Sequence, residues 1–193
     1  MRAIMNRKEI DYYQEIAHEL VLLFESELED DSYTVKPLIG EISSALRTLI
    51  ANGYEAGELL RSYSMEVHRL HLDVSVLIEH KETGKFEVII FEIKKVNGLG
   101  LNELSQLIGY CLVSKAKFGI LVNVDKAVSS QFSIILDADK DLTEIIRITD
   151  GKKLSHQFGV MVWNSDTLKI EYTNSGSIKS IPQLVSLIVN SVS

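Results

Sequence analysis

The first part of the chain has hydrophobic residues at helical spacing. Between residues 8 and 29, apolar side chains recur every three or four positions, from Ile10 to Phe24. This period predicts an amphipathic helix with one buried face. A second helix is predicted over residues 37–52, because Pro37 suits the first helical position and an Asn-Gly pair closes the segment.

The middle of the chain has the shorter apolar runs that predict β-strands. Residues 62–70 and 72–80 give two strands, and residues 85–95 give a third after the polar turn KETGK. A glycine-containing loop leads to a helix over residues 102–116 and a short buried strand over residues 118–124. This order of elements indicates an α/β fold with a central mixed β-sheet flanked by helices.

The last third, residues 125–193, is expected to extend the sheet or to cover one of its faces. We interpret residues 1–193 as a single domain, with residues 1–36 as an N-terminal helical segment, because the chain is too short for two full domains. Residues 141–148 fit either a short helix or a strand. The other predicted elements are strands over residues 132–138, 158–164 and 167–174, and a helix over residues 182–192.

The composition is that of an ordinary globular protein, with 46% hydrophobic and 24% charged residues. Cys111 is the single cysteine, which excludes an intramolecular disulfide and a cysteine-based zinc site. The N-terminus lacks the apolar core of a secretory signal, and no stretch approaches the roughly 20 apolar residues that span a bilayer. We therefore expect an intracellular, cytoplasmic protein without a membrane partner.

The net charge of −7 argues at first against a nucleic-acid partner, since phosphate contacts come from Lys and Arg. The distribution of the charge weakens this argument. Residues 1–60 contain twelve acidic and five basic side chains, whereas residues 61–193 contain fifteen of each. The acidic excess therefore lies in the N-terminal third, and the rest of the chain can still present a basic surface.

Charged residues stand at the ends of the two strands that the KETGK turn joins. The run EVIIFEIKK ends with Glu92 and Lys94, and Asp73 lies near the start of the preceding strand. If the Thr-Gly pair is the centre of the turn, Asp73 lies opposite Lys94 and Ser75 opposite Glu92. Opposed residues share a face of a sheet, as do residues two apart, so the three charged side chains are predicted to converge. A loop with an odd number of residues and no bulge would instead separate them.

Two carboxylates brought together raise each other's pKa unless a cation lies between them. Mg²⁺ or Mn²⁺ suits this arrangement, because a hard divalent ion binds through one or two carboxylates, retains waters and holds phosphate oxygens. Such an ion lowers the pKa of a bound water, which Lys94 could then orient. On the next predicted helix, Gln106 and Tyr110 share a face near the end that adjoins this strand.

These residues resemble the PD-(D/E)XK nuclease superfamily, which includes restriction endonucleases and archaeal Holliday-junction resolvases. The E-x-K tripeptide alone is a weak signal, whereas the ordered set is more specific. Leu72 replaces the nominal proline, a departure that the family commonly shows. The resemblance covers roughly residues 38–124 and implies a restriction-endonuclease-like core. The set consists of Asp73 in LDVSVLI, Glu92 and Lys94 in VIIFEIKK, and Gln106 in SQLIGY, followed by the strand FGILVNV.

The resemblance also implies a role for each matching residue. Asp73, Glu92 and the backbone carbonyl of Ile93 would bind the metal, Lys94 would assist the attacking water, and Gln106 would support the site. Family members often use an additional Glu from the helix before the sheet. The candidates for it in this chain are Glu41, which is the best match, and Glu55 and Glu58.

The resemblance implies a metal-dependent nuclease that hydrolyses phosphodiester bonds, with DNA as the expected nucleic acid. A homodimer is also expected, because family members often cut two strands as dimers. The alternative is a catalytically inactive member of the fold that binds nucleic acid or a protein partner. The acidic N-terminal third and the absence of a strong basic cluster in the sequence favour this alternative.

Overall fold

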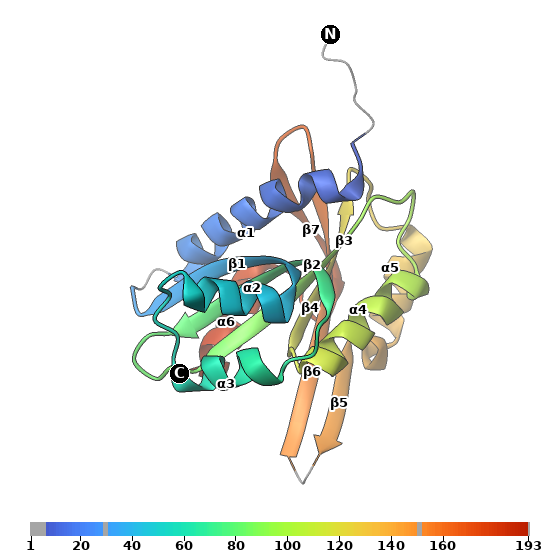
Figure 1. Ribbon diagram of the computed structural model, residues 1–193. Helices are drawn as coiled ribbons and strands as arrows, with labels where there is room; N and C mark the ends of the chain where they lie inside the picture. Colours follow the sequence, from blue (N-terminus) through green and yellow to red (C-terminus); the bar gives the residue numbers. More distant parts are fainter. Residues whose placement is uncertain (1–6, 29–30, 150–151, 193) are drawn as a thin grey trace.

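The computed structural model describes residues 7–28, 31–149 and 152–192. Within these residues, seven strands form one mixed β-sheet, which confirms the predicted α/β class (Figure 1). The order across the sheet is β1 (Tyr33–Glu41), β2 (His71–His80), β3 (Phe86–Lys94), β4 (Phe118–Val124), β6 (Lys152–Asn164) and β5 (Glu144–Thr149), and β7 (Lys169–Gly176) also pairs with β6. Strands β3, β4 and β6 are parallel neighbours, and every other pair is antiparallel.

Helices cover both faces of the sheet (Figure 1). One face packs against α1 (Tyr13–Leu28) and α6 (Ile181–Val192), and the 3₁₀ helix η1 (Glu9–Tyr12) precedes α1. The opposite face packs against α2 (Ile42–Ala51), α3 (Glu58–Glu66), α4 (Leu101–Ser114) and α5 (Ser130–Ala138), which the short 3₁₀ helix η2 (Lys140–Leu142) follows. The sheet is therefore buried on both sides, as its parallel centre requires.

The predicted helix in the first part of the chain is confirmed, and its apolar stripe faces the sheet. Ile16, Leu20 and Phe24 of α1 are fully buried. The ring of Phe24 meets the ring of Phe91 in β3 edge to face, with centroids 6.3 Å apart. Burial of each such side chain contributes about 1.5–3 kcal/mol to folding. This packing holds η1, at the start of α1, close to the end of β3.

The prediction that a helix begins at Pro37 was wrong. Residues 37–41 belong to β1, which is an edge strand, and α2 begins at Ile42. Proline is tolerated on an edge strand because its missing N–H can face away from the neighbouring strand. Pairing of β1 with β2 along its whole length decided the structure here, rather than local helical spacing.

Two predicted strands are helices in the structure. Much of the segment over residues 62–70 lies in α3, whose buried residues Leu60 and Ser64 are four positions apart. The segment over residues 132–138 lies in α5. Ser129 is the N-cap residue of this helix, and its side chain accepts a hydrogen bond from the N–H of Phe132 at 3.2 Å. A serine cap followed by a one-sided apolar stripe favours a helix, even in a run rich in β-branched residues.

The remaining predicted elements are confirmed within a few residues at their ends, except that β6 begins six residues before the strand predicted over residues 158–164. They are the strands over residues 72–80, 85–95, 118–124, 158–164 and 167–174 and the helices over residues 102–116 and 182–192. Residues 144–148 form part of β5, so the strand alternative holds for most of that segment. Residues 1–6 and 193 of the predicted single domain and residue 29 of the first predicted helix lie outside the described residues.

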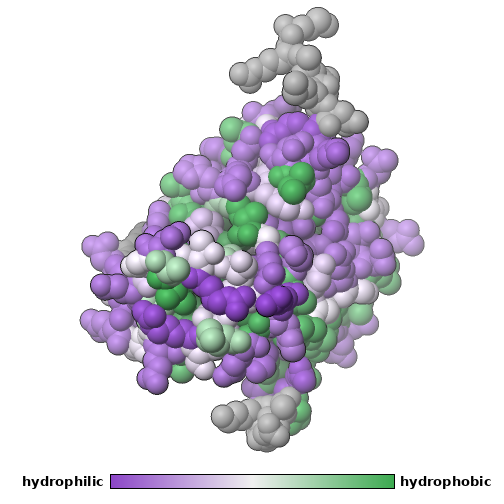
Figure 2. Space-filling view, in the orientation of Figure 1, coloured by the Kyte–Doolittle hydropathy of each residue, from purple (hydrophilic) through white to green (hydrophobic). Residues whose placement is uncertain are grey.

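Among the described helices, none is long and apolar enough to cross a bilayer. The face of the molecule shown in Figure 2 is largely hydrophilic, and its hydrophobic residues are distributed in small separate patches.

Candidate functional site

The hairpin of β2 and β3, which carries the predicted site, has a different register from the predicted one. Ser75 pairs with Ile90 rather than with Glu92. The predicted pairing, which also placed Asp73 opposite Lys94, was therefore wrong by two residues. Because side chains alternate with a period of two, this shift leaves Glu92 and Lys94 on one face of β3, as predicted.

The loop explains the shift. The N–H of His80 donates to the carbonyl oxygen of Lys85 at 2.9 Å and closes a four-residue loop over residues 81–84. Gly84 takes the positive φ of 64° at the last loop position. The two central residues of the loop are therefore Glu82 and Thr83, whereas the prediction placed Thr83 and Gly84 at the centre.

Asp73 occupies an irregular position at the start of β2. On the β1 side, Ile39 pairs with Val74 but Gly40 pairs with Leu72, so Asp73 is an extra residue between two ladder pairs. Gly40 has a φ of 84°, a conformation that other residues rarely adopt. A β-bulge of this kind interrupts strand pairing and redirects a side chain. Here it leaves the Asp73 carboxylate half-buried at the end of the strand.

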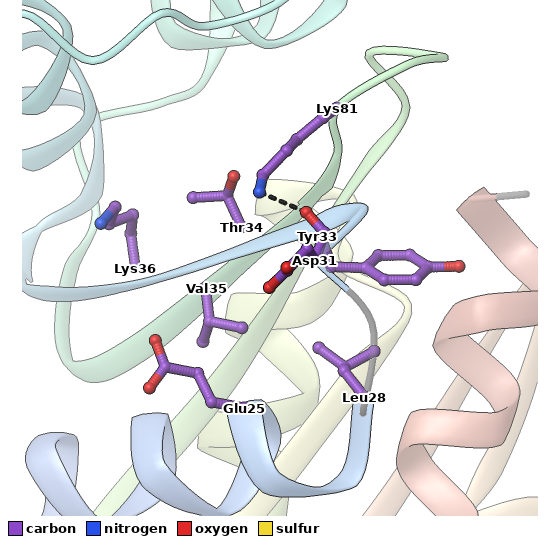
Figure 3. A pocket seen from close by; sticks show the side chains of 8 residues that line it. All are labelled: Glu25, Leu28, Asp31, Tyr33, Thr34, Val35, Lys36 and Lys81. Carbon is purple, nitrogen blue, oxygen red and sulfur yellow. Dashed lines mark hydrogen bonds between the residues drawn. The ribbon is translucent and has the colours of Figure 1, made fainter.

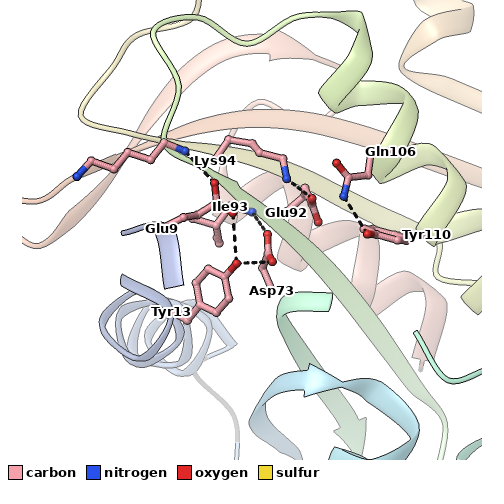
Figure 4. A network of polar contacts seen from close by, with 9 residues as sticks. Glu9, Tyr13, Asp73, Glu92, Ile93, Lys94, Gln106 and Tyr110 are labelled. Atoms are coloured by element: carbon pink, nitrogen blue, oxygen red, sulfur yellow. Dashed lines mark hydrogen bonds and ion pairs between the residues drawn. The ribbon is translucent and has the colours of Figure 1, made fainter. Parts of the chain in front are cut away.

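The Asp73 carboxylate links β2 to two other elements (Figure 4). Its Oδ2 accepts a hydrogen bond from the backbone N–H of Ile93 at 2.8 Å, and its Oδ1 accepts one from the Tyr13 hydroxyl of α1. Burial and the hydrogen bond to Asp73 raise the pKa of Tyr13, so the hydroxyl remains a donor. In a strand, the N–H and C=O of one residue point to the same side. The Ile93 carbonyl therefore points toward Asp73, as the resemblance predicts for a metal ligand.

Glu92 is the most deeply buried charged residue of the site, with 1% of its surface exposed. Its Oε1 accepts a hydrogen bond from Lys94 Nζ at 2.5 Å. Its Oε2 is buried and has no hydrogen-bond partner among the described residues. Burial raises the pKa of Glu92 to about 7; the hydrogen bond and charge of Lys94 oppose this shift, and the charges of Asp73 and Glu9 add to it. An unpaired buried carboxylate oxygen is costly, and a cation would relieve that cost.

Lys94 is held in the charged state by its surroundings. Burial alone lowers the pKa of its ammonium group, but the hydrogen bond and charge of Glu92, with the charges of Glu9 and Asp73, raise the pKa above its usual value. The side chain therefore supplies one positive charge beside three carboxylates. The structure brings Asp73, Glu92 and Lys94 together at the end of the hairpin, although by a different register from the predicted one (Figure 4).

Glu9 of η1 is the third carboxylate, and the sequence reasoning missed it. Its Oε2 accepts a hydrogen bond from the backbone N–H of Lys95 at 3.1 Å, and its Oε1 accepts one from the Tyr13 hydroxyl at 3.4 Å (Figure 4). Glu9 and Tyr13 are four residues apart, a spacing that indicates a shared helix face. Nothing in the sequence indicates that this face meets the end of β3.

The three glutamates that were proposed to complete the site lie elsewhere or bind other partners. Glu41 ends β1 and pairs with His71 in the ladder, and its carboxylate accepts a hydrogen bond from the Ser43 hydroxyl. Glu55 lines a cavity with Glu79, near the end of β2 opposite to Asp73. Glu58 is an exposed residue in the first turn of α3. Of the upstream glutamates that the structure describes, Glu9 is the one that accepts a hydrogen bond from Lys95, the residue after β3.

Gln106 and Tyr110 share a face of α4, as predicted. The Gln106 amide donates to the Tyr110 hydroxyl at 2.8 Å. Figure 4 shows this pair near the Glu92–Lys94 pair, on the side away from Tyr13. Gln106 is exposed, and within the described residues no hydrogen bond joins it to Glu92 or Lys94. Its amide is therefore available to a molecule bound in front of β3.

The donors at the end of β3 fit a hard divalent cation. In the part of the chain that the structure describes, no three His, Cys, Asp or Glu side chains are grouped closely enough to hold a metal by themselves. Mg²⁺ does not need such a group, because it binds through one or two carboxylates and completes its coordination with waters and substrate phosphates. Asp73, the unpaired Oε2 of Glu92 and the Ile93 carbonyl are oxygen donors of that kind.

A different cavity lies at the edge of the sheet, between α1 and β1 (Figure 3). It has a volume of about 330 Å³, and its walls carry both signs of charge, including Glu25, Asp31 and Lys36. The Lys81 ammonium group donates to the backbone carbonyl of Asp31 there. Mixed charges that face solvent do not define a reaction, so the end of β3 is the stronger candidate for a functional site.

No protein-family model matches the chain, and no curated protein matches it. The candidate site is therefore defined by its own geometry.

Proposed function

We propose that the protein is a metal-dependent nuclease that hydrolyses phosphodiester bonds, with DNA as the expected substrate and Mg²⁺ or Mn²⁺ as the cofactor. The observation that carries this proposal is the buried, unpaired Oε2 of Glu92 beside Asp73 and Lys94. Lys94 contacts the other oxygen of this carboxylate, and a bound cation would satisfy Oε2, which no described residue contacts as a donor. We further propose that the core is restriction-endonuclease-like, that the protein acts inside the cell, and that it forms a homodimer.

Each residue has a distinct part in this proposal. Asp73, Glu92 and the Ile93 carbonyl would hold the ion, and Glu9 would hydrogen-bond waters around it. The Lys94 ammonium group would orient the attacking water and offset negative charge on the phosphate. Gln106 would donate a hydrogen bond to a phosphate oxygen. A bound Mg²⁺ would supply Lewis acidity and lower the pKa of the attacking water.

The proposal is tested by a cleavage panel over single-stranded DNA, duplex, flap and four-way junction, with Mg²⁺ and with Mn²⁺. The wild-type protein should cut at least one substrate, and Glu92→Gln and Lys94→Ala should each reduce the rate by 100-fold or more, on the order of the effect of losing an electrostatic group at a reaction centre. Glu79→Gln is the matched control, because Glu79 is a buried carboxylate on the same hairpin, bonded to Tyr54 and to the N–H of Gly57. A folded Glu92→Gln protein that cuts at the wild-type rate would remove the assignment.

A second candidate function is a noncatalytic module that binds nucleic acid or a protein partner. Both oxygens of Asp73 already accept hydrogen bonds, from Tyr13 and Ile93, which is an arrangement that needs no metal. The acidic excess of residues 1–60 also disfavours close approach of a polyanion. Calorimetric titration with Mg²⁺ and Mn²⁺ separates the two candidates: absence of metal binding together with absence of cleavage would favour the noncatalytic module.

A further inference from the structure

A cavity of about 380 Å³ opens directly beside the candidate site. It lies between the first helical segment and the bulged ends of β1 and β2. Ile10, Tyr13, Ile39 and Leu72 contribute apolar surface to its walls, and His71 and Asp73 contribute polar groups. Ile10 is 65% exposed although it is a large aliphatic residue. An apolar wall with a few polar groups is the usual character of a small-molecule site.

Asp73 connects this cavity to the acidic site. It lines the cavity, and its carboxylate also accepts the hydrogen bond from the N–H of Ile93, next to Glu92. Tyr13 also lines the cavity, and its hydroxyl donates a hydrogen bond to Asp73. A phosphate bound through a metal ion at Asp73 and Glu92 would therefore place the neighbouring part of its own molecule at the mouth of the cavity.

The lining suits one part of a nucleotide in particular. A nucleobase has apolar faces, which stack on aromatic rings in a sequence-tolerant way, and polar edges. The Tyr13 ring offers a stacking surface, Ile10 and Ile39 offer aliphatic contacts, and Gln14 offers an amide that can donate and accept. The lining includes one carboxylate, that of Asp73, and one imidazole, that of His71. A sugar-phosphate backbone would find no lysine or arginine in this lining.

We propose that this cavity binds the base of an unpaired nucleotide next to the scissile phosphate. The proposal rests on the nuclease function proposed above. A base that is stacked and paired in a duplex cannot enter a cavity without leaving the helix, which costs a few kcal/mol. The substrate class is therefore nucleic acid with an unpaired nucleotide at the cleaved position, such as a single strand or a flap.

The test compares two Mg²⁺-containing reactions, binding and cleavage. Binding is measured with the Lys94→Ala protein and an oligonucleotide whose single-stranded segment carries either a normal or an abasic nucleotide at the cleaved position. Removal of the base should weaken binding about five- to 100-fold, the range expected for loss of one base–aromatic contact. Cleavage by the protein with an intact Lys94 should show the same preference, and a fully paired duplex should be cut more slowly than the flap.

Variants of exposed residues assign the effect to the cavity. Ile10→Ser should reduce the discrimination between the normal and the abasic oligonucleotide, whereas Leu22→Ser should not, because Leu22 is 48% exposed further along α1 and does not line the cavity. Tyr13→Phe should retain the preference for a base, because the ring remains, and Tyr13→Leu should lose it. Thermal unfolding of each variant shows whether it is folded.

The possible results separate this inference from the proposed function. Cleavage without any effect of the base, or equal effects of Ile10→Ser and Leu22→Ser, would overturn the base-binding cavity and leave the nuclease intact. Base-dependent binding without cleavage would support the cavity and overturn the nuclease. Absence of both would overturn both.

Discussion

Glu92 is the residue at which the needs of folding and the needs of the candidate site conflict. Its side chain is almost fully enclosed at the end of β3, and one carboxylate oxygen lacks a partner among the described residues. Lys94 neutralises part of the charge, but the charges of Asp73 and Glu9 act in the opposite direction. A buried carboxylate with a raised pKa and an unpaired oxygen is typical of a functional site.

This conflict predicts how stability depends on pH at residue 92. The pKa of Glu92 is about 7 in the folded protein and 4.5 is its usual value, so the unfolded chain loses its proton first as the pH rises. The resulting penalty is absent below pH 4.5, grows between pH 4.5 and 7, and is complete above pH 7. Its full size is about 3 kcal/mol, on the order of 1.4 kcal/mol per pH unit.

Glu92→Gln removes this penalty, so its free energy of unfolding should rise relative to that of the wild type across the window from pH 4.5 to 7. Urea unfolding in metal-free buffer at pH 4.5 and at pH 7.5 measures the change. Glu66→Gln, on the exposed surface of α3, is the control and should show no such trend. A constant difference between Glu92→Gln and wild type at the two pH values would contradict the prediction.

Among the elements, β6 has the most demanding position, because β5 and β7 share one of its edges. The N-terminal part of β6 pairs with β5, and its C-terminal part pairs with β7. Between them, Gly159 forms an isolated bridge with Ile178. A methyl group at Gly159 would meet the carbonyl oxygen of Ile178 at 2.4 Å, a distance that backbone atoms cannot accommodate without moving. The chain after β7 can therefore pack closely onto the sheet only because residue 159 is a glycine.

Gly159→Ala should destabilise the protein by about 1–3 kcal/mol, as overpacking in a core usually does. Gly109→Ala is the matched control in the middle of α4, where a methyl group would have nothing within 4 Å. It should be neutral or stabilise the protein by up to about 1 kcal/mol, because Ala favours the helix. Denaturant midpoints of the two variants measure both effects, and a Gly159→Ala protein as stable as the wild type would be inconsistent with the close approach.

The elements predicted correctly from the sequence are those in which the spacing of the hydrophobic residues matches the face that is buried in the structure. The helix α1 and the strands β2, β3 and β4 have long regular patterns that the sheet and its cover simply bury. The prediction was wrong where tertiary pairing overrode a local signal, as at Pro37, or where a single cap residue decided the element, as at Ser129. The predicted pairing of β2 with β3 differs by two residues from the observed one. The reason is that Gly84, which has a positive φ, is the last residue of the loop and not one of its two central residues.

The candidate site could be predicted for the residues that one hairpin brings together. The shared face of Glu92 and Lys94 follows from the alternation of side chains, which tolerates a shift of two residues. The direction of the Asp73 side chain depends instead on the bulge in β2. Glu9 and Tyr13 reach the site from a helix far away in the sequence, and helical periodicity does not specify which strand end a helix will meet. The bulge at Asp73 also depends on a neighbouring strand that was predicted as a helix.

For the whole molecule, both ends of the described chain contribute to the same apolar cluster. Helix α1 and helix α6 pack on one face of the sheet, and Trp163 of β6 is buried in that cluster. On the same side, Ser191 and Lys117 both hydrogen-bond Glu87, which ties α6 to β3 and β4. One shared core favours a single cooperative unfolding transition.

The fluorescence of Trp163, the single tryptophan, and the far-ultraviolet circular dichroism should therefore show coincident unfolding curves. Ile188→Ala in α6 should shift both curves together, with a loss of about 2–5 kcal/mol for removal of fully buried aliphatic groups. Transitions that separate in the variant would show instead that α6 unfolds independently of the sheet.

The charge distribution of the whole molecule predicts an unusual dependence on salt. The acidic excess lies in residues 1–60, and η1 brings Glu9 of that segment to the candidate site. A polyanion should therefore bind poorly until divalent cations neutralise this region. Fluorescence anisotropy with a labelled oligonucleotide and the Lys94→Ala protein measures this. Millimolar Mg²⁺ should promote binding, whereas NaCl at equal ionic strength should not, and equal effects of the two salts would contradict the prediction.

The bulge beside Gly40 has an evolutionary consequence. The direction of the Asp73 carboxylate on β2 depends on this bulge. The unusual backbone conformation at the bulge belongs to Gly40 on the neighbouring strand β1, which has no side chain. Selection that preserves Asp73 should then also act on Gly40, across the strand boundary. In descendants that abandon the chemistry, both constraints should relax together, so the two positions should change as a pair.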